Sequence, residues 1–376
     1  MSKRLIALLL AGVVAGAPAM AQGPDPRIAQ VEARVAGLAP YAKLPACREK
    51  AEPARWTAAG KPDAGRKKPL ISAHRGGNTL APENTLAAYE AAFALGVDFI
   101  EVDIRETKDG VLIANHDDTV DRTTDGTGAV ADLTWEQVRR LNSADYAPWK
   151  GGPFDPSRVA TLEEVLQLAK DAGAGLELDI KIGTADARIA ALVDKYGLTE
   201  KSIFNSQRVD ALKAAPGARL IYNRNSWEPP SLLYQVAKAS PVFGSRLAEF
   251  TPEAIAAIHD GCGVVMPHAY DAGGAQEAAQ FLEARARGAD GVQTNQPELI
   301  VATAGLKVKS RLVVRDGQAC LVNAKNGMGI YGKTLSVTGG KGGKTALHGC
   351  AKVEGPRGAV VSFPGDAAIG PARARL

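Results

Sequence analysis

Long apolar segments, aromatic residues and cysteines are all scarce in this sequence. After residue 21, no run reaches the roughly 18 consecutive apolar residues that a membrane-spanning helix requires. Aromatic residues make up 5% of the 376 residues, which argues against an aromatic-rich sandwich throughout. A hydrophobic content of 45% excludes a disordered chain and is enough for one large core and a small second one. With 40 glycines and 22 prolines, the composition favours a turn-rich α/β protein.

The first 21 residues have the pattern of a secretory signal peptide. Lys3 and Arg4 precede an apolar run from Leu5 to Ala17, and Ala19-Met20-Ala21 has the small-x-small form of a cleavage site. The run is too short to span the roughly 30 Å of membrane hydrocarbon. We therefore expect cleavage after residue 21 and export to the periplasm or the extracellular space. The alternative is an uncleaved N-terminal anchor.

Export would make the four cysteines, Cys47, Cys262, Cys320 and Cys350, candidates for disulfides. We prefer a bond between Cys320 and Cys350, because both lie in one C-terminal segment and the bridge would stabilise a small domain. Cys47 and Cys262 either form a second disulfide or remain buried thiols, and the sequence leaves this open. The spacing does not fit a zinc ribbon.

Positive charge is concentrated at the C-terminal end. Residues 306–376 contain 12 Lys and Arg but 3 Asp and Glu, whereas the whole chain has 45 and 41. This asymmetry predicts a separate basic module joined to an acidic body. The module either binds an anionic surface or is simply a solvated basic domain, and both alternatives stay open. Nucleic-acid recognition is not supported, because Tyr331 and Phe363 are the only aromatic residues in this stretch.

The chain between the signal peptide and the basic module divides into a leader and a body. We expect residues 22–68 to form an N-terminal leader with a short helix at Ile28–Leu38. From 69 to 305, short apolar runs alternate with helical periodicity, which is typical of βα units. The expected strands are Leu70–Ala73, Phe99–Ile104, Val111–Asn115, Gly175–Lys181, Ser202–Asn205, Arg219–Tyr222, Val242–Ser245, Gly263–Met266 and Gly291–Thr294. The expected helices are Asn84–Leu95, Thr161–Ala172, Ala185–Tyr196, Gln207–Ala214, Pro252–His259 and Ala275–Arg287.

The third expected strand follows the second after a turn that contains Asp109 and Gly110. Parallel neighbours need a crossover of about a dozen residues, so this short turn predicts an antiparallel hairpin arm. Eight strands remain, and the sequence therefore predicts an α/β fold, a (β/α)8 TIM barrel with an inserted hairpin and loop segment, over residues 69–305.

After Gly305 the helical periodicity ends, and we expect a small all-β domain at 306–376. The glycine-rich stretch from Gly339 to Lys344 lacks the spacing of a phosphate-binding loop, and we interpret it as a hairpin tip.

Two of the expected barrel strands carry acidic residues at alternating positions. Glu101 and Asp103 share one face of their strand, and Glu177, Asp179 and Lys181 share one face of another. A buried pair of carboxylates is costly unless a cation compensates it, which indicates a hard divalent metal. Salt-bridged or mouth-exposed carboxylates are the alternative. Glu177 lies deeper in its strand than the other two, which favours a supporting role.

Histidines follow two of the expected strands. His74 ends the first strand, and His116 ends the hairpin arm. Histidine is the side chain best suited to gain and lose protons near neutral pH, so both are acid–base candidates. His268 follows another strand and either lines the site or does not. We expect structural roles for His259 and His348.

Several short motifs follow one another along the expected barrel. They are Ala73-His74-Arg75-Gly76, Ala81-Pro82-Glu83-Asn84-Thr85, Glu101-Val102-Asp103, Thr107-Lys108-Asp109-Gly110, His116-Asp117, Arg122-Thr123-Thr124-Asp125-Gly126-x-Gly128, Thr161-Leu162-Glu163-Glu164-Val165-Leu166, Asp179-x-Lys181 and Gly288-Ala289-Asp290-Gly291-Val292. In both order and spacing they resemble the motifs of the glycerophosphodiester phosphodiesterase family, and the resemblance covers roughly residues 69–305.

The resemblance implies a TIM-barrel hydrolase of glycerophosphodiesters that uses Ca²⁺ or Mg²⁺. Residues 118–160 match the family's inserted segment over the barrel mouth. The implied roles are metal ligation by Glu101, Asp103 and Asp179, acid–base chemistry by His74 and His116, phosphate contacts by Arg75 and Lys181, and support of the first loop or the metal's surroundings by Glu83.

Three positions depart from the family pattern. Asp179 stands where the family usually has Glu, Met266-Pro267-His268-Ala269 replaces a Trp-Thr-x-Asn motif, and Asn295 replaces the Asp of a Thr-Asp-x-Pro motif. The last two changes lie in loops expected to line the substrate pocket and leave the accepted alcohol open. Two alternatives therefore remain: a phospholipase D-like enzyme acting on lysophospholipids or sphingolipids, and a non-catalytic envelope-binding protein.

Overall fold

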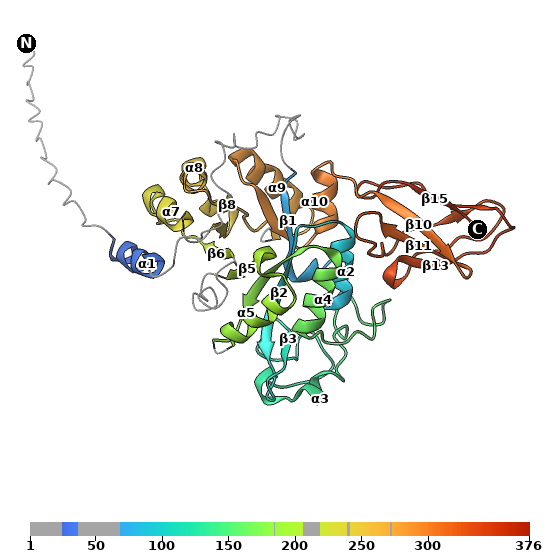
Figure 1. Cartoon of the computed structure of the whole chain (residues 1–376), viewed down its shortest axis with the longest axis horizontal. Coiled ribbons are helices and arrows are strands. Elements are labelled where there is room, and N and C mark those ends of the chain that lie inside the picture. Colours follow the sequence, from blue (N-terminus) through green and yellow to red (C-terminus); the bar gives the residue numbers. More distant parts are fainter. Residues whose placement is uncertain (1–24, 37–67, 184, 206–218, 239–240, 271–272) are drawn as a thin grey trace, which may run out of the picture.

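The computed structural model describes residues 25–36, 68–183, 185–205, 219–238, 241–270 and 273–376. Eight parallel strands and their helices form the body, and a β-rich module follows at the C-terminal end (Figure 1). The expected signal peptide, most of the leader, Cys47 and the helix expected at Gln207–Ala214 lie outside the described residues. Within those residues, none of the helices is both long and apolar enough to cross a membrane.

The body is the predicted TIM barrel, with the strand order β8-β7-β6-β5-β4-β2-β1-β9. Each strand is an apolar run at or close to its expected place. The strands are β1 (Leu70–Ala73), β2 (Phe99–Glu106), β4 (Gly175–Ile180), β5 (Ser202–Asn205), β6 (Arg219–Asn223), β7 (Val242–Gly244), β8 (Val264–Val265) and β9 (Gly291–Thr294).

Backbone hydrogen bonds between the chain around β8 and β9 close the ring. The Asp290 amide donates to the Val265 carbonyl at 2.9 Å, and the Ala269 amide donates to the Gln293 carbonyl at 2.8 Å. His268 forms isolated parallel bridges with both Arg246 and Gln293. The loop that follows β8 is thereby fixed next to β9. These are the two strands at the ends of the strand order, so the barrel closes here.

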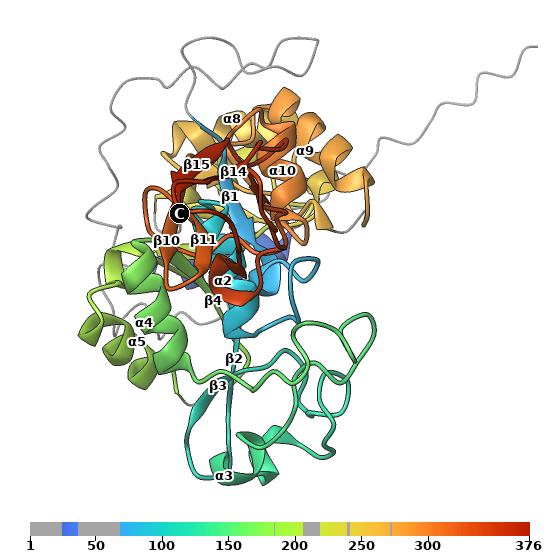
Figure 2. The same cartoon turned by 90° about the vertical axis from the view of Figure 1, so that its right-hand side faces the viewer.

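The third expected strand is β3 (Leu112–Ala114), and it pairs antiparallel with the end of β2, from Ile104 opposite Ala114 to Glu106 opposite Leu112. This confirms the predicted hairpin arm. The hairpin and the segment that follows it project from the barrel in two perpendicular views (Figures 1 and 2). An apolar cluster of Ile113, Val120, Val130, Val138 and Val159 forms the core of this extension.

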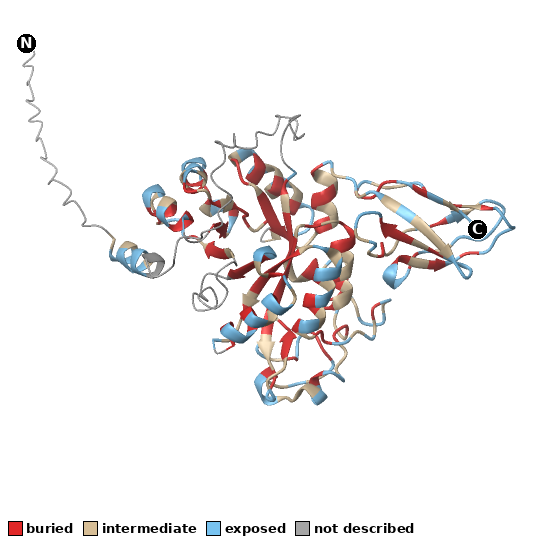
Figure 3. Cartoon of the chain, in the orientation of Figure 1, coloured by how far each residue is buried: buried red, intermediate tan, exposed pale blue. Residues whose placement is uncertain are grey.

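Helices surround the barrel and bury one face against it, so that in Figure 3 the strands are buried and the helices are mixed. Their ends follow local signals. Thr161 and Glu164 form a capping box at the start of α4, and Gly173 ends it in the left-handed conformation. The helices are α1 (Pro26–Ala36), α2 (Leu86–Ala94), α3 (Trp135–Val138), α4 (Leu162–Ala172), α5 (Asp186–Lys195), α7 (Pro230–Ala237), α8 (Pro252–Asp260), α9 (Gln276–Arg287) and α10 (Pro297–Thr303).

Three of these helices, α3, α7 and α10, were not expected from the sequence, and α3 has 4 residues. Helices α7 and α10 are short, with 8 and 7 residues, and each begins with a proline. A proline at the first helical position suits a helix because its missing N–H has no intrahelical partner there. A proline in so short an apolar segment nevertheless obscures the helical periodicity. The leader helix α1 contacts α7, and the Arg27 guanidinium lies 4.3 Å from the centre of the Trp227 ring.

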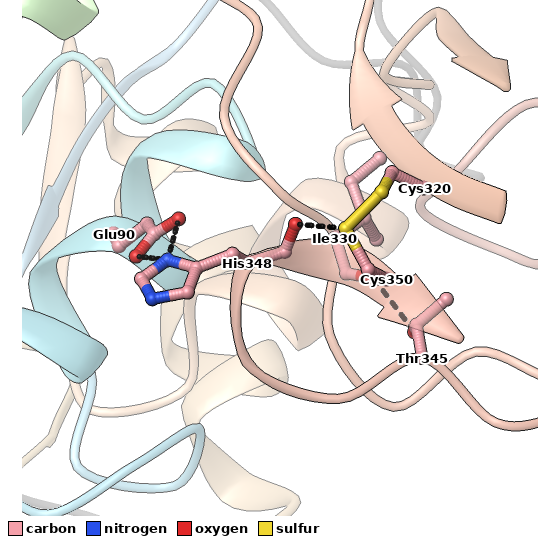
Figure 4. Close-up of a disulfide and its surroundings, with 6 residues drawn as sticks. All are labelled: Glu90, Cys320, Ile330, Thr345, His348 and Cys350. Carbon is pink, nitrogen blue, oxygen red and sulfur yellow. Dashed lines mark hydrogen bonds and ion pairs between the residues drawn. A yellow bond between two sulfur atoms is a disulfide. The ribbon is translucent and has the colours of Figure 1, made fainter. Parts of the chain in front are cut away.

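The C-terminal module consists of two three-stranded antiparallel sheets, as its predicted all-β character requires. Cys320 and Cys350 lie opposite each other on β11 and β13 and form the expected disulfide (Figure 4). Cys262 is also disulfide-bonded. The strands are β10 (Ser310–Arg315), β11 (Gln318–Asn323), β12 (Ser336–Val337), β13 (Cys350–Lys352), β14 (Val360–Phe363) and β15 (Ala372–Arg375).

The module docks on α2 and α10 of the barrel. Asn323 and Asn326 donate side-chain hydrogen bonds of 2.9 Å to the carbonyls of Ala94 and Phe93, at the end of α2. His348 forms an ion pair with Glu90 of α2 at 2.8 Å (Figure 4). The Ala94 carbonyl has no partner within α2, so the module helps to cap the C-terminal end of this helix, while the Phe93 carbonyl also accepts from the Gly96 amide.

Candidate active site

Two neighbouring strands bring the acidic side chains together. In the parallel ladder of β2 and β4, Glu101 lies beside Glu177 and Asp103 lies beside Asp179. Alternation along the strands turns all four side chains toward the barrel interior. A layer of apolar residues that includes Phe99, the first residue of β2, packs at the opposite end of the strands. The polar site therefore occupies the carboxyl end, where TIM barrels carry their active sites.

Glu101, Asp103 and Asp179 form a group that could hold a metal ion. Carboxylate oxygens of the three residues lie within 4.8 Å of one another. Glu101 and Asp103 are almost fully buried, with 3% and 1% exposure. Burial and the neighbouring charges of Asp103 and Asp179 raise the pKa of Glu101 well above its usual value. A hard divalent cation fits this donor set, because it takes oxygen ligands and compensates the crowded negative charge. The shorter Asp179 still reaches the group.

Lys181 and Arg75 supply positive charge to the same carboxylates. The Lys181 ammonium lies 3.0 Å from Asp103 Oδ1 and 2.5 Å from Asp179 Oδ2. The Arg75 guanidinium lies 3.5 Å from Asp103 Oδ2. Burial alone would raise the pKa of Asp103, but Lys181, Arg75 and a hydrogen bond from Asn84 outweigh it and lower this pKa. Asp103 therefore stays ionised.

The turn after β1 places Arg75 by means of an unusual backbone conformation. Arg75 has a φ of 52°, in the left-handed region, and its amide donates to Glu101 Oε2 at 2.7 Å. Gly76 follows with a φ of 83°, and a Cβ there would lie 2.7 Å from the Tyr89 ring. Only glycine fits this close approach to α2. The strain at Arg75 is maintained by the bond to Glu101, which is typical of functional sites.

Asn84 and Tyr89 form a chain of two hydrogen bonds that supports Asp103. The Asn84 amide group donates to Asp103 Oδ2 at 2.8 Å, and the Tyr89 hydroxyl donates to Asn84 Oδ1 at 2.7 Å. All three are buried. The sequence analysis noted Asn84 within the Pro-Glu-Asn-Thr motif but assigned it no role. The sequence signal for Asn84 was its place directly after Glu83, which was expected to act at the site.

Glu83 connects the first loop to the inserted segment. It accepts hydrogen bonds from Arg75 at 3.0 Å and from Arg122 at 2.7 Å, and its amide donates to the Tyr146 hydroxyl at 2.9 Å. Burial opposes its ionisation, yet the hydrogen bond from Arg122 and the charge of Arg75 lower the pKa of Glu83. Glu83 therefore orients Arg75. Among the described residues, no hydrogen bond joins Glu83 to any of the three candidate metal ligands.

Glu177 lies deeper than the other acidic residues, as its position in β4 predicts. It accepts hydrogen bonds from Ser72 Oγ at 2.7 Å and from Gln293 Nε2 at 2.8 Å. Burial raises the pKa of Glu177 to about 7. These bonds link β4 to β1 and β9 across the barrel, so its role is to tie three strands together beneath the site.

His74 is held on two sides. Its Nδ1 lies 2.7 Å from Asn295 Oδ1, after β9. Its ring stacks on Tyr270, with centroids 4.0 Å apart and 8° between the planes. Burial and the nearby charge of Arg75 lower the pKa of His74 to about 4. The imidazole is therefore neutral at physiological pH.

His116 is paired with a carboxylate from its own loop. Its Nδ1 lies 2.6 Å from Asp117 Oδ1, and Arg122 Nε donates to Asp117 Oδ2 at 2.6 Å. The hydrogen bond from Arg122 lowers the pKa of Asp117 to about 2. His116 itself is about one-third exposed. Asp117 is thus an ionised acceptor that fixes the orientation of the ring, an arrangement common for acid–base histidines.

A small cavity opens between these side chains at the barrel mouth. It brings together four of the residues singled out from the sequence, His74, Glu101, Glu177 and Asp179, and also His268, whose place was left open. His116, Arg75 and Lys181 are not among its lining residues. The lining consists of His74, Glu101, Glu177, Leu178, Asp179, Ile221, Asn223, His268, Tyr270 and Gln293.

Tyr270 was missed by the sequence analysis. It stacks between His74 and His268, with its centroid 5.0 Å from that of His268, and its hydroxyl lies 3.1 Å from His268 Nδ1. The motif comparison had indicated the loss of an aromatic residue in this loop. Tyr270 supplies an aromatic ring one position beyond the segment compared, so the loss is partly compensated.

Comparisons with known proteins agree with this geometry. Residues 74–243 match the model of the glycerophosphoryl diester phosphodiesterase family. The chain is 32% identical to a glycerophosphodiester phosphodiesterase of Caldanaerobacter subterraneus over 249 residues, which are 62% of this chain and 97% of that protein. The chain belongs to the glycerophosphodiester phosphodiesterase family. It is therefore an enzyme of the phosphodiesterase class, with glycerophosphodiesters as the substrate class of its family.

Solved structures of the family share the fold of the body. A glycerophosphodiester phosphodiesterase from Agrobacterium tumefaciens is 28% identical, with a TM-score of 0.55, over 62% of this chain and 98% of that one. An Oleispira antarctica phosphodiesterase, solved with the product sn-glycerol-3-phosphate, is 24% identical, with a TM-score of 0.53, over 62% of this chain and 96% of that one. The match to the family model ends at residue 243, so the C-terminal module lies outside it.

Proposed function

We propose that this enzyme is an exported, divalent-metal-dependent phosphodiesterase that hydrolyses small glycerophosphodiesters to glycerol 3-phosphate and an alcohol. The observation that carries the proposal is the convergence of Glu101, Asp103 and Asp179 within 4.8 Å at the carboxyl end of the barrel. His74, in the turn after β1, lines the same cavity as Glu101 and Asp179. The Oleispira antarctica phosphodiesterase was solved with its product sn-glycerol-3-phosphate, which is also a product in this proposal.

Glu101, Asp103 and Asp179 would hold the metal ion. Ca²⁺ and Mg²⁺ are the candidates, since three carboxylates are a hard oxygen donor set. When bound, such an ion supplies positive charge to the phosphate oxygens, on which negative charge increases in the transition state. The identity of the ion is part of the proposal and is left to the metal-addition assay below.

His74 is suited to accept a proton. Because the side-chain oxygen of Asn295 can only accept, the Nδ1 of His74 carries the proton and donates it, 2.7 Å away. The Nε2 atom then has a lone pair. A pKa of about 4, caused by burial and by Arg75, keeps the ring in this neutral state. His74 is therefore the general base that takes the proton of the attacking hydroxyl.

His116 is suited to donate a proton. The ionised Asp117 accepts a hydrogen bond from its Nδ1 at 2.6 Å and fixes the orientation of the ring. Its partial exposure at the mouth allows the ring to exchange protons with solvent. The bond between phosphorus and the alcohol oxygen breaks, and the departing oxygen receives the proton of His116. The attacking group is either water, which gives glycerol 3-phosphate directly, or the 2-hydroxyl of the glycerol moiety, which gives a cyclic phosphate that water must then open.

Arg75 and Lys181 complete the charge balance. Both lie against Asp103, and Arg75 is also held by Glu83. The proposal assigns both of them contacts with the phosphate, whose negative charge they would balance. Interactions that strengthen as the phosphate oxygens gain charge stabilise the transition state selectively.

Export is supported by two independent features. Residues 1–21 have the charge, apolar run and small-residue end of a signal peptide. The disulfide between Cys320 and Cys350 is a bond that forms and persists in an oxidising compartment.

The test is an assay of the purified protein with glycerophosphocholine and, separately, with lysophosphatidylcholine. Each substrate is measured after treatment with EDTA, and again after addition of Ca²⁺ or Mg²⁺. The proposal predicts release of glycerol 3-phosphate and choline from glycerophosphocholine, loss of activity in EDTA and recovery with one of the two ions. Release of choline from lysophosphatidylcholine alone would assign the phospholipase D-like activity instead. Turnover that is insensitive to EDTA would contradict metal dependence.

A further inference from the structure

A second cavity lies where the C-terminal module meets the barrel. Its volume is about 530 Å³, within the range of small-molecule binding sites. The barrel contributes the first residues of its strands, among them Leu70, Phe99 and Gly175. The module contributes the connection before β10 and the turn after β11. We call this space the basal cleft.

The basal cleft is separate from the active site. Its barrel wall consists of residues at the amino ends of the parallel strands, whereas His74 and the three candidate metal ligands lie toward the carboxyl ends. In a TIM barrel these two ends are opposite faces. A ligand in the basal cleft therefore does not contact the catalytic groups.

Basic residues line both walls of the cleft. Among the described lining residues there are six cations and one carboxylate, that of Asp98. Asp98 is already engaged, because it accepts from the Ile71 amide at 3.0 Å and lies 3.4 Å from the Lys68 ammonium. The cations are Lys68, Lys201 and Arg219 from the barrel, and Lys307, Lys309 and Lys325 from the module.

Lys201 and Arg219 are held in place by backbone carbonyls, whereas Lys68 lies beside Asp98. Lys201 donates to the Gly173 carbonyl at 3.1 Å, and Arg219 donates to the Glu200 carbonyl at 2.7 Å. The Arg219 guanidinium also lies 5.9 Å from the centre of the Phe99 ring. These contacts fix the positions of the two charges, and among the residues that the structure describes neither forms a salt bridge with a carboxylate.

The module's cations differ according to their place. Lys333, which touches the barrel elsewhere, is paired with Glu298 at 2.5 Å and Asp366 at 2.9 Å. By contrast, no carboxylate in the described part of the chain forms a salt bridge with Lys307, Lys309 or Lys325. The docking contact therefore pairs the charge of Lys333, whereas Lys68 is the one cleft cation that lies beside a carboxylate among the described residues.

We propose that the basal cleft binds a small polyanion that carries two or more phosphate groups. A ligand with a single charge would contact one wall, whereas two separated phosphates can engage the barrel and module cations together. Arg and Lys are the side chains that bind phosphate, and a counter-anion relieves the repulsion among like charges. The concave shape, between two walls, suits a soluble polyphosphate or the phosphorylated head group of a lipid. The cleft would recognise the phosphate groups that both kinds of ligand carry.

The test uses the full-length protein and inorganic tripolyphosphate, with binding measured by isothermal titration calorimetry at low and high salt. The cleft variant is Lys307→Gln/Lys309→Gln/Lys325→Gln. The matched control removes three charges from the same module outside the cleft, at Lys341, Lys344 and Lys352, also to Gln. These are exposed positions, and thermal melting checks that both variants fold.

We expect the wild-type protein to bind tripolyphosphate, with an affinity that falls as salt rises because salt screens the charges. The cleft variant should bind at least about tenfold more weakly, and the control within about threefold of wild type. No binding by the wild type, or equal losses in the two variants, would overturn the proposal. Hydrolysis of glycerophosphocholine should be the same in all three proteins, so this test is independent of the proposed function.

A second experiment distinguishes the sources of the phosphate. Cosedimentation is measured with phosphatidylcholine vesicles that contain or lack a phosphatidylinositol bisphosphate. Retention that the cleft variant loses and the control keeps assigns a lipid head group. If tripolyphosphate binds through the cleft but neither vesicle retains the protein, the ligand is a soluble polyanion. Equal retention of both variants on the charged vesicles would show general basicity and contradict a built site.

Discussion

His74 Nδ1 lies 2.7 Å from the side-chain oxygen of Asn295, which joins the turn after the first barrel strand to the loop after the last one. The contact fixes which nitrogen of the imidazole carries its proton. The neutral amide oxygen stabilises the protonated ring less than a carboxylate would. The hydrogen bond to Asn295 raises the pKa of His74, but burial and the charge of Arg75 outweigh it and lower this pKa to about 4.

The first prediction concerns this pair and the pH dependence of kcat/KM. A base must be deprotonated to act, so in the wild type the contribution of His74 is lost only as the pH falls through about 4. Asn295→Asp places a carboxylate on Nδ1, stabilises the imidazolium and raises the pKa of His74 by about one unit or more. The acidic limb of the pH profile should move upward by that amount.

Gln137→Glu adds the same charge in the capping box of α3 and serves as the control. Glutamate also caps a helix at this position, so the fold should be kept. Its pH profile should match the wild type. An unchanged acidic limb in Asn295→Asp, or an equal shift in the control, would contradict the assignment of His74 as the base.

The second prediction concerns Tyr270 as a positioning residue. Its ring stacks on His74, and such contacts contribute about 0.5–1.5 kcal/mol. Tyr270→Ala should lower kcat by up to about tenfold with little change in KM, because the imidazole loses one of its two supports. Tyr270→Phe keeps the stack, loses the hydroxyl contact with His268 and should retain most of kcat. If Tyr270→Phe and Tyr270→Ala lower kcat equally, stacking on His74 is not the cause of the loss.

The third prediction tests the two acid–base candidates directly. His74→Ala and His116→Ala should each lower kcat by at least about 100-fold while the melting temperature stays near that of the wild type. His348→Ala is the matched control, because this histidine is 75% exposed and lies in the C-terminal module. Near-wild-type turnover in either of the first two variants would remove that residue from the mechanism.

The fourth prediction concerns the C-terminal disulfide. Cys320 and Cys350 are 30 residues apart, and a loop of this length gives a stabilisation of about 3–4 kcal/mol. Cys320→Ser/Cys350→Ser should lower the free energy of unfolding of the module by this order, measured by denaturant titration together with limited proteolysis of residues 306–376. The kcat for glycerophosphocholine should change little, since the catalytic groups belong to the barrel. Equal proteolysis rates in variant and wild type would contradict a stabilising role.

The fold could be predicted almost entirely from the sequence between 69 and 305. The strands are apolar runs bounded by turn residues, and the hairpin of β2 and β3 follows from a connection too short for a parallel crossover. Helices α7 and α10 escaped because 8 and 7 residues contain about two helical turns, too few to define a period.

The acidic half of the site could also be predicted, because Glu101, Asp103 and Asp179 lie in regular strands whose alternation fixes their direction. The partners of the histidines could not. Asn295 and Tyr270 lie in loops after β9 and β8, and they meet His74 only because the ring of strands closes. Contacts between loops distant in sequence depend on tertiary packing, which no local pattern encodes.

The central claim is that three carboxylates hold one catalytic divalent ion. The most direct measurement is equilibrium dialysis of the metal-free protein against Ca²⁺ and Mg²⁺, with glycerophosphocholine turnover followed in the same samples. The account predicts that one ion binds per chain in step with the recovery of turnover, and that Asp103→Asn loses both while remaining folded. Full turnover by the metal-free protein, or ion binding that Asp103→Asn leaves unchanged, would contradict it.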